Sequence, residues 1–225
     1  VDTQPATYQH MPASPEVREH WVNSQLIGVM MDNLGPSLLA GALTLPVLVY
    51  LMAGEVNGIV LSVWVLLMVF MLVYRYRLIG LYRLQFDSVE GPQRVAFLRR
   101  YQWTWGAAAL LWGGSVSLVY LQASLLTQFV CALVILGQAL LNLTAFSAYL
   151  PVYRAYANSL TLAVMAGLLV AASGHLDNPG AVQATLILEV LTLVFWFLMR
   201  LAGNRLNHVH HSSFELQFSN QELID

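Results

Sequence analysis

The sequence has no lysine and few charged residues of any kind. Asp, Glu, Lys and Arg together make up 10% of its 225 residues, whereas hydrophobic residues make up 58%. A soluble globular domain carries roughly 25% charged residues. The shortage of charge therefore excludes an ordinary soluble domain and favours an integral membrane protein. The length accommodates about six membrane spans of ~20 residues each.

Cysteine is also scarce. Cys131 is the one cysteine and lies inside an apolar run, so no disulfide can form within the chain. The sequence contains no Gly-rich phosphate loop and no His-Glu-x-x-His motif. We therefore predict neither a catalytic residue nor a metal site within these residues. The first ~20 residues lack the apolar core of a cleavable signal peptide.

Six apolar segments predict an all-α fold, a polytopic membrane bundle of six transmembrane helices over residues 34–203. Residues 1–33 are predicted to be a cytoplasmic tail with an amphipathic helix over 16–31 that lies on the membrane surface. Asp32 or Asn33 is expected to cap the first span. Residues 204–225 are expected to continue the last helix into the cytoplasm. The predicted spans are 34–53, 57–77, 103–121, 125–147, 157–173 and 183–203.

The arginines predict the orientation in the membrane. One precedes the first span, six lie between the second and third, one lies between the fourth and fifth, and two lie at and after the end of the sixth. The alternate connections at 53–57, 121–125 and 173–182 contain none. Positively charged residues concentrate on the cytoplasmic side of membrane proteins. Both termini are therefore predicted to be cytoplasmic.

Two groups of polar residues fall inside the predicted spans. Glu189 shares a helix face with Thr185 and Thr192, and Gln138 and Asn142 form an i,i+4 pair in the fourth span. Ionisable groups within a membrane usually face the bundle interior and mark functional sites. These residues are either a ligand or proton site between spans four and six, or hydrogen-bonding groups that hold the helices together. The sequence leaves both interpretations open.

The segment after the last span has the pattern of a short coiled coil. Four apolar residues, one Ser and one Asn recur at spacings of three and four, and Asn220 at an a position favours a parallel dimer in a fixed register. We call these positions the seam. The seam is formed by Leu206, Val209, Ser213, Leu216, Asn220 and Leu223.

Three histidines lie beside the seam. On a helix, His208 and His211 share a face but His210 does not, which argues against a three-ligand metal site. Their role stays open.

Two stretches carry a resemblance to a known family. Residues 146–153 read Phe-Ser-Ala-Tyr-Leu-Pro-Val-Tyr before the last two spans, and residues 213–223 read Ser-Phe-Glu-Leu-Gln-Phe-Ser-Asn-Gln-Glu-Leu after them. Both resemble the membrane sensory regions of bacterial signalling proteins, most often hybrid sensor histidine kinases and otherwise diguanylate cyclases. The resemblance implies that a linker leads to an output domain that is not present in these residues. The linker positions that it supplies are Phe214, Leu216, Phe218, Asn220 and Leu223.

We therefore expect the transmembrane sensory and dimerisation module of a two-component sensor histidine kinase in a bacterial inner membrane. The resemblance implies a homodimer, a response regulator as partner, and ATP and Mg for a downstream kinase domain. The same input module on a diguanylate cyclase is one alternative, and a small-solute or ion transporter is another. No nucleic-acid partner is expected. The outer loops are too short to form a separate ligand-binding domain, so we expect either a small-molecule ligand that is apolar or partitions into the membrane, or a signal that is a property of the lipid bilayer.

Overall fold

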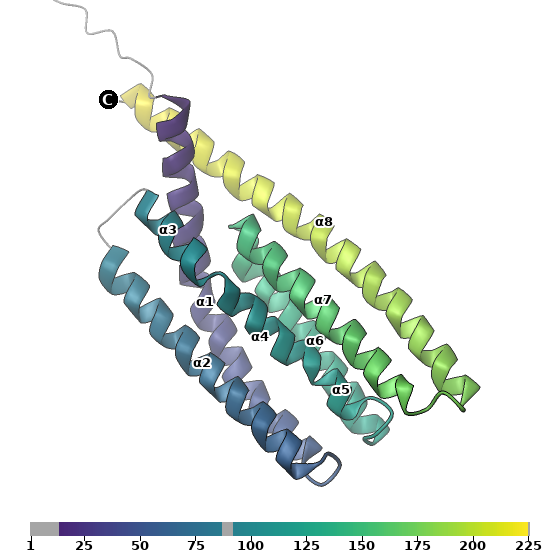
Figure 1. The fold of residues 1–225 in the computed structure, drawn as a ribbon. Helices are drawn as coiled ribbons and strands as arrows, with labels where there is room; N and C mark the ends of the chain where they lie inside the picture. The colour runs from purple at the N-terminus through teal and green to yellow at the C-terminus, as the bar shows by residue number, and fades with distance from the viewer. Residues whose placement is uncertain (1–13, 87–91, 225) are drawn as a thin grey trace, which may run out of the picture.

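A computed structural model of the chain describes residues 14–86 and 92–224, with side chains up to Asn220. All regular elements of this part of the chain are helices, so the prediction of an all-α fold is confirmed (Figure 1). The helices are α1 (Pro15–Met52), α2 (Gly58–Phe86), α3 (Pro92–Tyr101), α4 (Trp103–Gly114), α5 (Val116–Val119), α6 (Leu125–Phe146), α7 (Leu150–Ser173) and α8 (Pro179–Ile224).

Five of the described helices, α1, α2, α6, α7 and α8, are long and apolar enough to cross a membrane. The third span that the sequence predicts, at 103–121, is instead divided into α4 and α5 at Ser115. The Ser115 hydroxyl donates to the carbonyl oxygen of Trp112 at 2.6 Å, and its backbone N–H donates to the same oxygen at 3.3 Å. A serine that bonds to the preceding turn competes with the helical hydrogen bonds. The prediction of six uninterrupted spans is therefore not confirmed.

The predicted helix start at Asp32 or Asn33 is wrong. α1 is one helix of 38 residues that begins at Pro15, where the Ser14 hydroxyl accepts a hydrogen bond from the backbone N–H of Val17 (3.4 Å). Proline is tolerated inside a helix when packing on both sides outweighs the lost hydrogen bond. Buried residues precede and follow Pro36, and they hold the helix continuous. The segment 16–31 is thus a direct extension of the first span and not a separate helix on the membrane surface.

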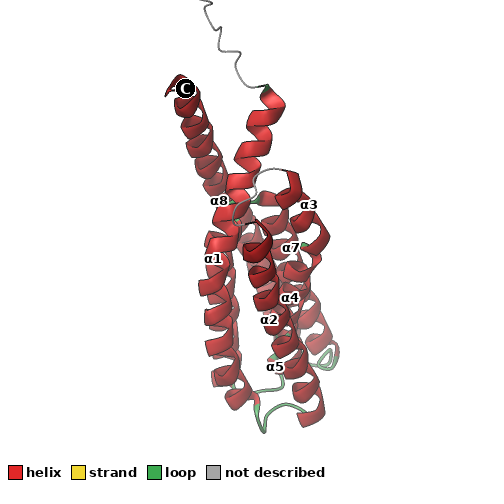
Figure 2. Cartoon of the chain, turned by 90° about the vertical axis from the view of Figure 1, so that its left-hand side faces the viewer, coloured by secondary structure: helices red, strands yellow, loops and turns green. Residues whose placement is uncertain are grey.

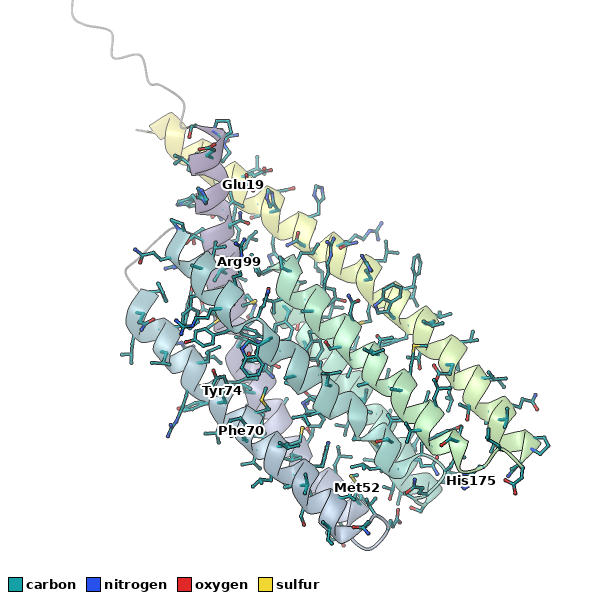
Figure 3. The ribbon with its side chains drawn as sticks, in the orientation of Figure 1. Glu19, Met52, Phe70, Tyr74, Arg99 and His175 are labelled. Carbon is teal, nitrogen blue, oxygen red and sulfur yellow. The ribbon has the colours of Figure 1, made fainter. Side chains whose placement is uncertain are left out.

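The long helices lie side by side with their axes roughly aligned (Figures 1 and 2). We call the end at which α6 stops and α7 starts the linker end, because α8 and the start of α1 extend past the other helices there (Figure 1). The opposite end, with the connections 53–57, 120–124 and 174–178, is the loop end. Met52 and His175 lie at the loop end, whereas Glu19 and Arg99 lie toward the linker end (Figure 3). The ten arginines lie toward the linker end: near the starts of α1 and α7, in the second half of α2, in α3, and at positions 200 and 205 of α8, beside the start of α7.

Small residues let α4 and α7 pack closely. A Cβ atom added at Gly113 of α4 would lie 2.8 Å from the carbonyl oxygen of Leu160 in α7. One added at Gly167 of α7 would lie 2.9 Å from the backbone nitrogen of Ser117. Only glycine permits such contact between backbones. These contacts fix α7 beside the α4–α5 pair, and α7 in turn positions the polar residues described below.

Candidate functional site

Gln138 and Asn142 lie in the interior of the bundle, where they join a buried hydrogen-bonded network. The Asn142 side-chain amide donates to the carbonyl oxygen of Gln138 (2.7 Å) and to the hydroxyl of Tyr156 (2.9 Å). Its oxygen accepts a hydrogen bond from the Ser37 hydroxyl (2.7 Å). The Gln138 amide donates to the hydroxyl of Thr44 (3.4 Å). The network therefore connects α6 with α1 and α7.

The hydrogen-bonding capacity of Asn142 is used by the protein itself. A buried amide that is satisfied in this way orders its neighbours. The contacts of Gln138 and Asn142 thus agree with the interpretation that these residues hold the helices together.

Glu189 and Thr185 lie elsewhere, on the side of α8 that faces the bundle. The Thr185 hydroxyl lies 3.1 Å from the hydroxyl of Tyr120 and donates to the carbonyl oxygen of Ala181 (2.8 Å). Glu189 is 8% exposed, and neither carboxylate oxygen has a hydrogen-bond partner. Thr192, on the same face, is half-buried. Among the described residues, no hydrogen bond joins this group to Gln138 or Asn142, so the predicted polar residues occupy two separate places.

Arg75 is a buried charge that the sequence analysis assigned only to membrane topology. It is 5% exposed, and its Nη2 atom has no hydrogen-bond partner. Its guanidinium lies over the ring of Phe146, 5.8 Å from the ring centroid. The same Phe146 ring packs edge-to-face on Tyr156, which belongs to the buried network, with 5.2 Å between the ring centroids.

A signal in the sequence could have identified Arg75. The buried residues of α2 recur at helical spacing, and Arg75 lies in the middle of that face. The buried positions are Leu61, Trp64, Met68, Met71, Arg75, Leu78, Ile79, Tyr82 and Phe86. A charged residue at the centre of a buried stripe is the exception that marks a site.

The C-terminal part of α8 packs against the start of α1. The Trp21 ring lies 6.3 Å from Phe214 and 5.4 Å from Phe218, measured between centroids. The guanidinium of Arg18 lies 5.6 Å from the Phe218 ring centroid. We call these four residues the aromatic contact. Two of the linker positions that the resemblance supplies, Phe214 and Phe218, therefore pack within the chain.

The seam lies on the other side of the same helix. By helical geometry, Phe214 and Phe218 are rotated by roughly 130–180° from the middle of the seam. The described seam residues Leu206, Val209, Ser213, Leu216 and Asn220 are all exposed, with Val209 at 64% and Leu216 at 66%. The side chain of Leu223 lies outside the described residues. No described residue of the same chain covers the seam.

The three histidines beside the seam lie on α8 and differ in exposure. His208 is exposed, whereas His210 and His211 are half-buried. His211 Nδ1 lies 3.4 Å from a carboxylate oxygen of Glu215. Among the described residues, no three His, Cys, Asp or Glu side chains come together in the arrangement of a metal site.

Polar contacts between α7 and α8 hold α8 near the linker end. The Tyr153 hydroxyl donates to the carbonyl oxygen of Met199 (2.6 Å), and Trp196 donates to Asn158 (2.9 Å). Farther along, the side-chain amide of Asn207 donates to the carbonyl oxygen of Ala148 (2.8 Å). These contacts lie along one side of α8, and most of the rest of its membrane-length part is exposed and apolar.

At the loop end, a carboxylate connects two neighbouring loops. A Glu55 carboxylate oxygen accepts a hydrogen bond from the backbone N–H of Ser124 (3.0 Å). Interaction with Ser124, through its hydroxyl and its backbone N–H, holds the pKa of Glu55 below its ordinary value of 4.5. Glu55 is fully exposed, so solvent screens this interaction.

Comparison with known proteins gives no relative: no family model, no curated protein and no solved structure matches the chain. The functional argument therefore rests on the residues and the geometry described above.

Proposed function

We propose that the chain is the transmembrane sensory and dimerisation module of a bacterial sensor histidine kinase. The observation that carries the proposal is the arrangement of α8. It is a single helix of 46 residues that begins at the loop end and extends past the linker end with an exposed seam. At 1.5 Å per residue, such a helix is about 70 Å long, more than twice the apolar thickness of a bilayer.

The two faces of the helix beyond the bundle support a parallel dimer. The aromatic contact covers one face, whereas the seam is left for a second copy of the chain. Leu and Val at heptad positions with Asn220 at an a position favour a two-stranded parallel coiled coil. Exposed Leu and Val in a heptad repeat are costly in water unless a partner covers them.

The orientation belongs to the same proposal. The concentration of arginine toward the linker end supports a cytoplasmic location for that end, in a bacterial inner membrane. A signal at the membrane would then displace α8 and reach a kinase that binds ATP and Mg²⁺ and transfers phosphate to a response regulator. A diguanylate cyclase in the place of the kinase is the alternative output.

Cysteine crosslinking in membranes tests the dimer. In a Cys131→Ala background, Val209→Cys and Leu216→Cys place thiols on the seam. His208→Cys and Glu215→Cys are matched controls, each one residue earlier and turned away from the seam. A parallel coiled coil predicts disulfide-linked dimers at 209 and 216 in several-fold excess over 208 and 215. Equal crosslinking at all four positions, or none at any, would contradict the proposal.

A further inference from the structure

Two side chains that contact the Phe146 ring carry buried hydrogen-bond donors without a partner. Arg75 Nη2 on α2 and Trp105 Nε1 on α4 are both enclosed without an acceptor. Each can only donate a hydrogen bond. Unpaired buried donors are rare in native structures and cost about 1–3 kcal/mol each, more when the group is charged. A missing acceptor at this place would account for both.

Tyr156 supplies a third donor by elimination. The carbonyl oxygen of Gln138 can only accept a hydrogen bond, which fixes the nitrogen of the Asn142 side chain as the atom beside it. That nitrogen also donates to the Tyr156 hydroxyl. The Tyr156 oxygen is therefore an acceptor in this bond, and its own hydrogen is left to donate. No acceptor for that hydrogen occurs among the described residues.

The ring of Phe146 contacts all three side chains that carry these donors. Its centroid lies 5.8 Å from the Arg75 guanidinium, 5.2 Å from the Tyr156 ring centroid and 6.4 Å from that of Trp105. Both ring pairs are edge-to-face, at 62° and 81°. Groups from α2, α4 and α7 thus converge on the last residue of α6.

The charge in this neighbourhood is positive and unbalanced. No carboxylate among the described residues forms an ion pair with Arg75. Arginine remains protonated in proteins, so a buried arginine without a counter-ion is strongly unfavourable. Arg75 lies 17 residues after Gly58, about 26 Å from the loop end. It therefore lies near the far boundary of a ~30 Å apolar layer, where lipid head groups meet acyl chains.

We infer that Arg75, Tyr156 and Trp105 form a binding site for the monoanionic oxyanion head of a membrane amphiphile, either a fatty acid carboxylate or a lipid phosphodiester. A single guanidinium is neutralised by one negative charge, which favours a monoanion. Its oxygens accept the hydrogen bonds that the three donors leave unused. If the chain is the proposed sensor, this amphiphile is its stimulus, and only that last step rests on the proposed function.

Binding of radiolabelled oleate to the purified chain in nanodiscs of neutral phosphatidylcholine tests the site. Methyl oleate has the chain without the charge, and acetate has the charge without the chain. In a parallel arm, phosphatidylglycerol is mixed into the nanodiscs, and the lipid retained on detergent extraction is quantified by mass spectrometry. We expect saturable binding of oleate or retention of phosphatidylglycerol, with methyl oleate and acetate at least tenfold weaker than oleate.

Arg75→Gln is expected to weaken binding at least tenfold, and Tyr156→Phe several-fold. Arg77→Gln is the matched control, because Arg77 is exposed two residues along the same helix and its loss removes the same charge. Arg75→Gln also removes an unpaired buried charge, so the unliganded variant should be at least as thermostable as the wild type.

Three results would overturn the inference: equal losses for Arg75→Gln and Arg77→Gln in the arm that shows binding, saturable binding of oleate that its methyl ester matches, or no saturable binding in either arm. The last result would mean that water alone satisfies the donors. The assay measures the chain without any output domain, so a failure here leaves the crosslinking test of the proposed function untouched, and the reverse also holds.

Discussion

α7 has two neighbours that it contacts in different ways. Against α4 and α5 it packs through glycine, with backbones in direct contact at Gly113 and Gly167. Against α8 it makes side-chain contacts, such as the hydrogen bond from Tyr153 to Met199 and the packing of the Tyr153 ring on Gly203. In the apolar 18-residue stretch of each helix that could cross a membrane, 11% of the residues are buried in α8 and 44% in α7.

The difference shows which interface can rearrange. Where two helix backbones touch, the contact is so close that adding even one methylene group would force them apart. A helix held by a few hydrogen bonds can break them individually, because each contributes only about 0.5–1.5 kcal/mol. α4, α5 and α7 therefore form the fixed part of the bundle, and α8 is the helix that can be displaced.

The largest expected effect comes from filling the contact between α4 and α7. Gly113→Leu would drive a side chain into the backbone of Leu160, which cannot move aside, and we expect a loss of about 3 kcal/mol or more of unfolding free energy. Gly114→Leu is the matched control, since a Cβ there meets nothing within 4 Å. The stability of both variants is measured by heating the protein and then quantifying the folded fraction by size-exclusion chromatography. Equal stability of the two variants would show that the contact is not rigid.

A similar change at the α7–α8 interface should act locally. A Cβ at Gly203 would lie 2.6 Å from Cζ of the Tyr153 ring, so Gly203→Val should cost about 2 kcal/mol and separate the two helices there. Hydrogen exchange should increase in α8 around residues 196–207 and remain unchanged in α4. Adding Tyr153→Ala removes the ring and should restore much of the protection. Increased exchange throughout the bundle would contradict a separable α8.

Removing a single polar contact should have a smaller effect. Tyr153→Phe deletes the hydroxyl that donates to Met199 and should lower the unfolding free energy by about 1 kcal/mol. Tyr76→Phe serves as the control, because Tyr76 is exposed on α2. Chemical or thermal unfolding in the same detergent gives the difference. A loss of unfolding free energy well above that of Gly203→Val would show that this one hydrogen bond holds α8 in place, and that α8 is not held by several weak contacts.

The smallest effect concerns the loop end, away from both interfaces. The folded pKa of Glu55 is lowered, so its contribution to stability is present above pH 4.5 and is lost as the pH falls through that lowered value. Protease sensitivity of the 53–57 and 120–124 loops should therefore rise on acidification below pH 4.5. Glu55→Gln should remove this pH dependence. If protease sensitivity of the loops still rises below pH 4.5 in Glu55→Gln, another titrating group causes the rise.

The sequence predicts the helices that have continuous apolar composition and misses what depends on packing. The sequence predicts a break between the spans 125–147 and 157–173, and the structure has one between Phe146 and Leu150, with Pro151 in the first turn of α7. The division at Ser115 is not predicted, because a serine interrupts a helix only when its hydroxyl takes the carbonyl of the preceding turn. α1 is continuous through Asp32 and Asn33 for a similar reason, since tertiary contacts outweigh the local capping pattern.

The candidate site was predictable in part. Burial of Glu189, Gln138 and Asn142 follows from the cost of polar groups in a membrane, and the structure buries all three. Their separation into two groups depends on which helices are neighbours, and spacing along one helix contains no such information. Arg75 was attributed to topology because nearby arginines mark the same end, although Arg75 is buried and Arg77 is exposed.

The continuity of α8 also has a consequence for evolution by recombination. In a helix without a break, the angle of each residue about the axis is fixed by its position in the sequence. Any helical segment joined to α8 is therefore oriented relative to the seam. An insertion of seven residues after Ser212 would preserve that orientation, whereas an insertion of three or four would rotate everything beyond it relative to the bundle. Exchange of any domain joined to such a helix would thus be limited by the number of residues at the junction, counted in sevens, more than by their identity.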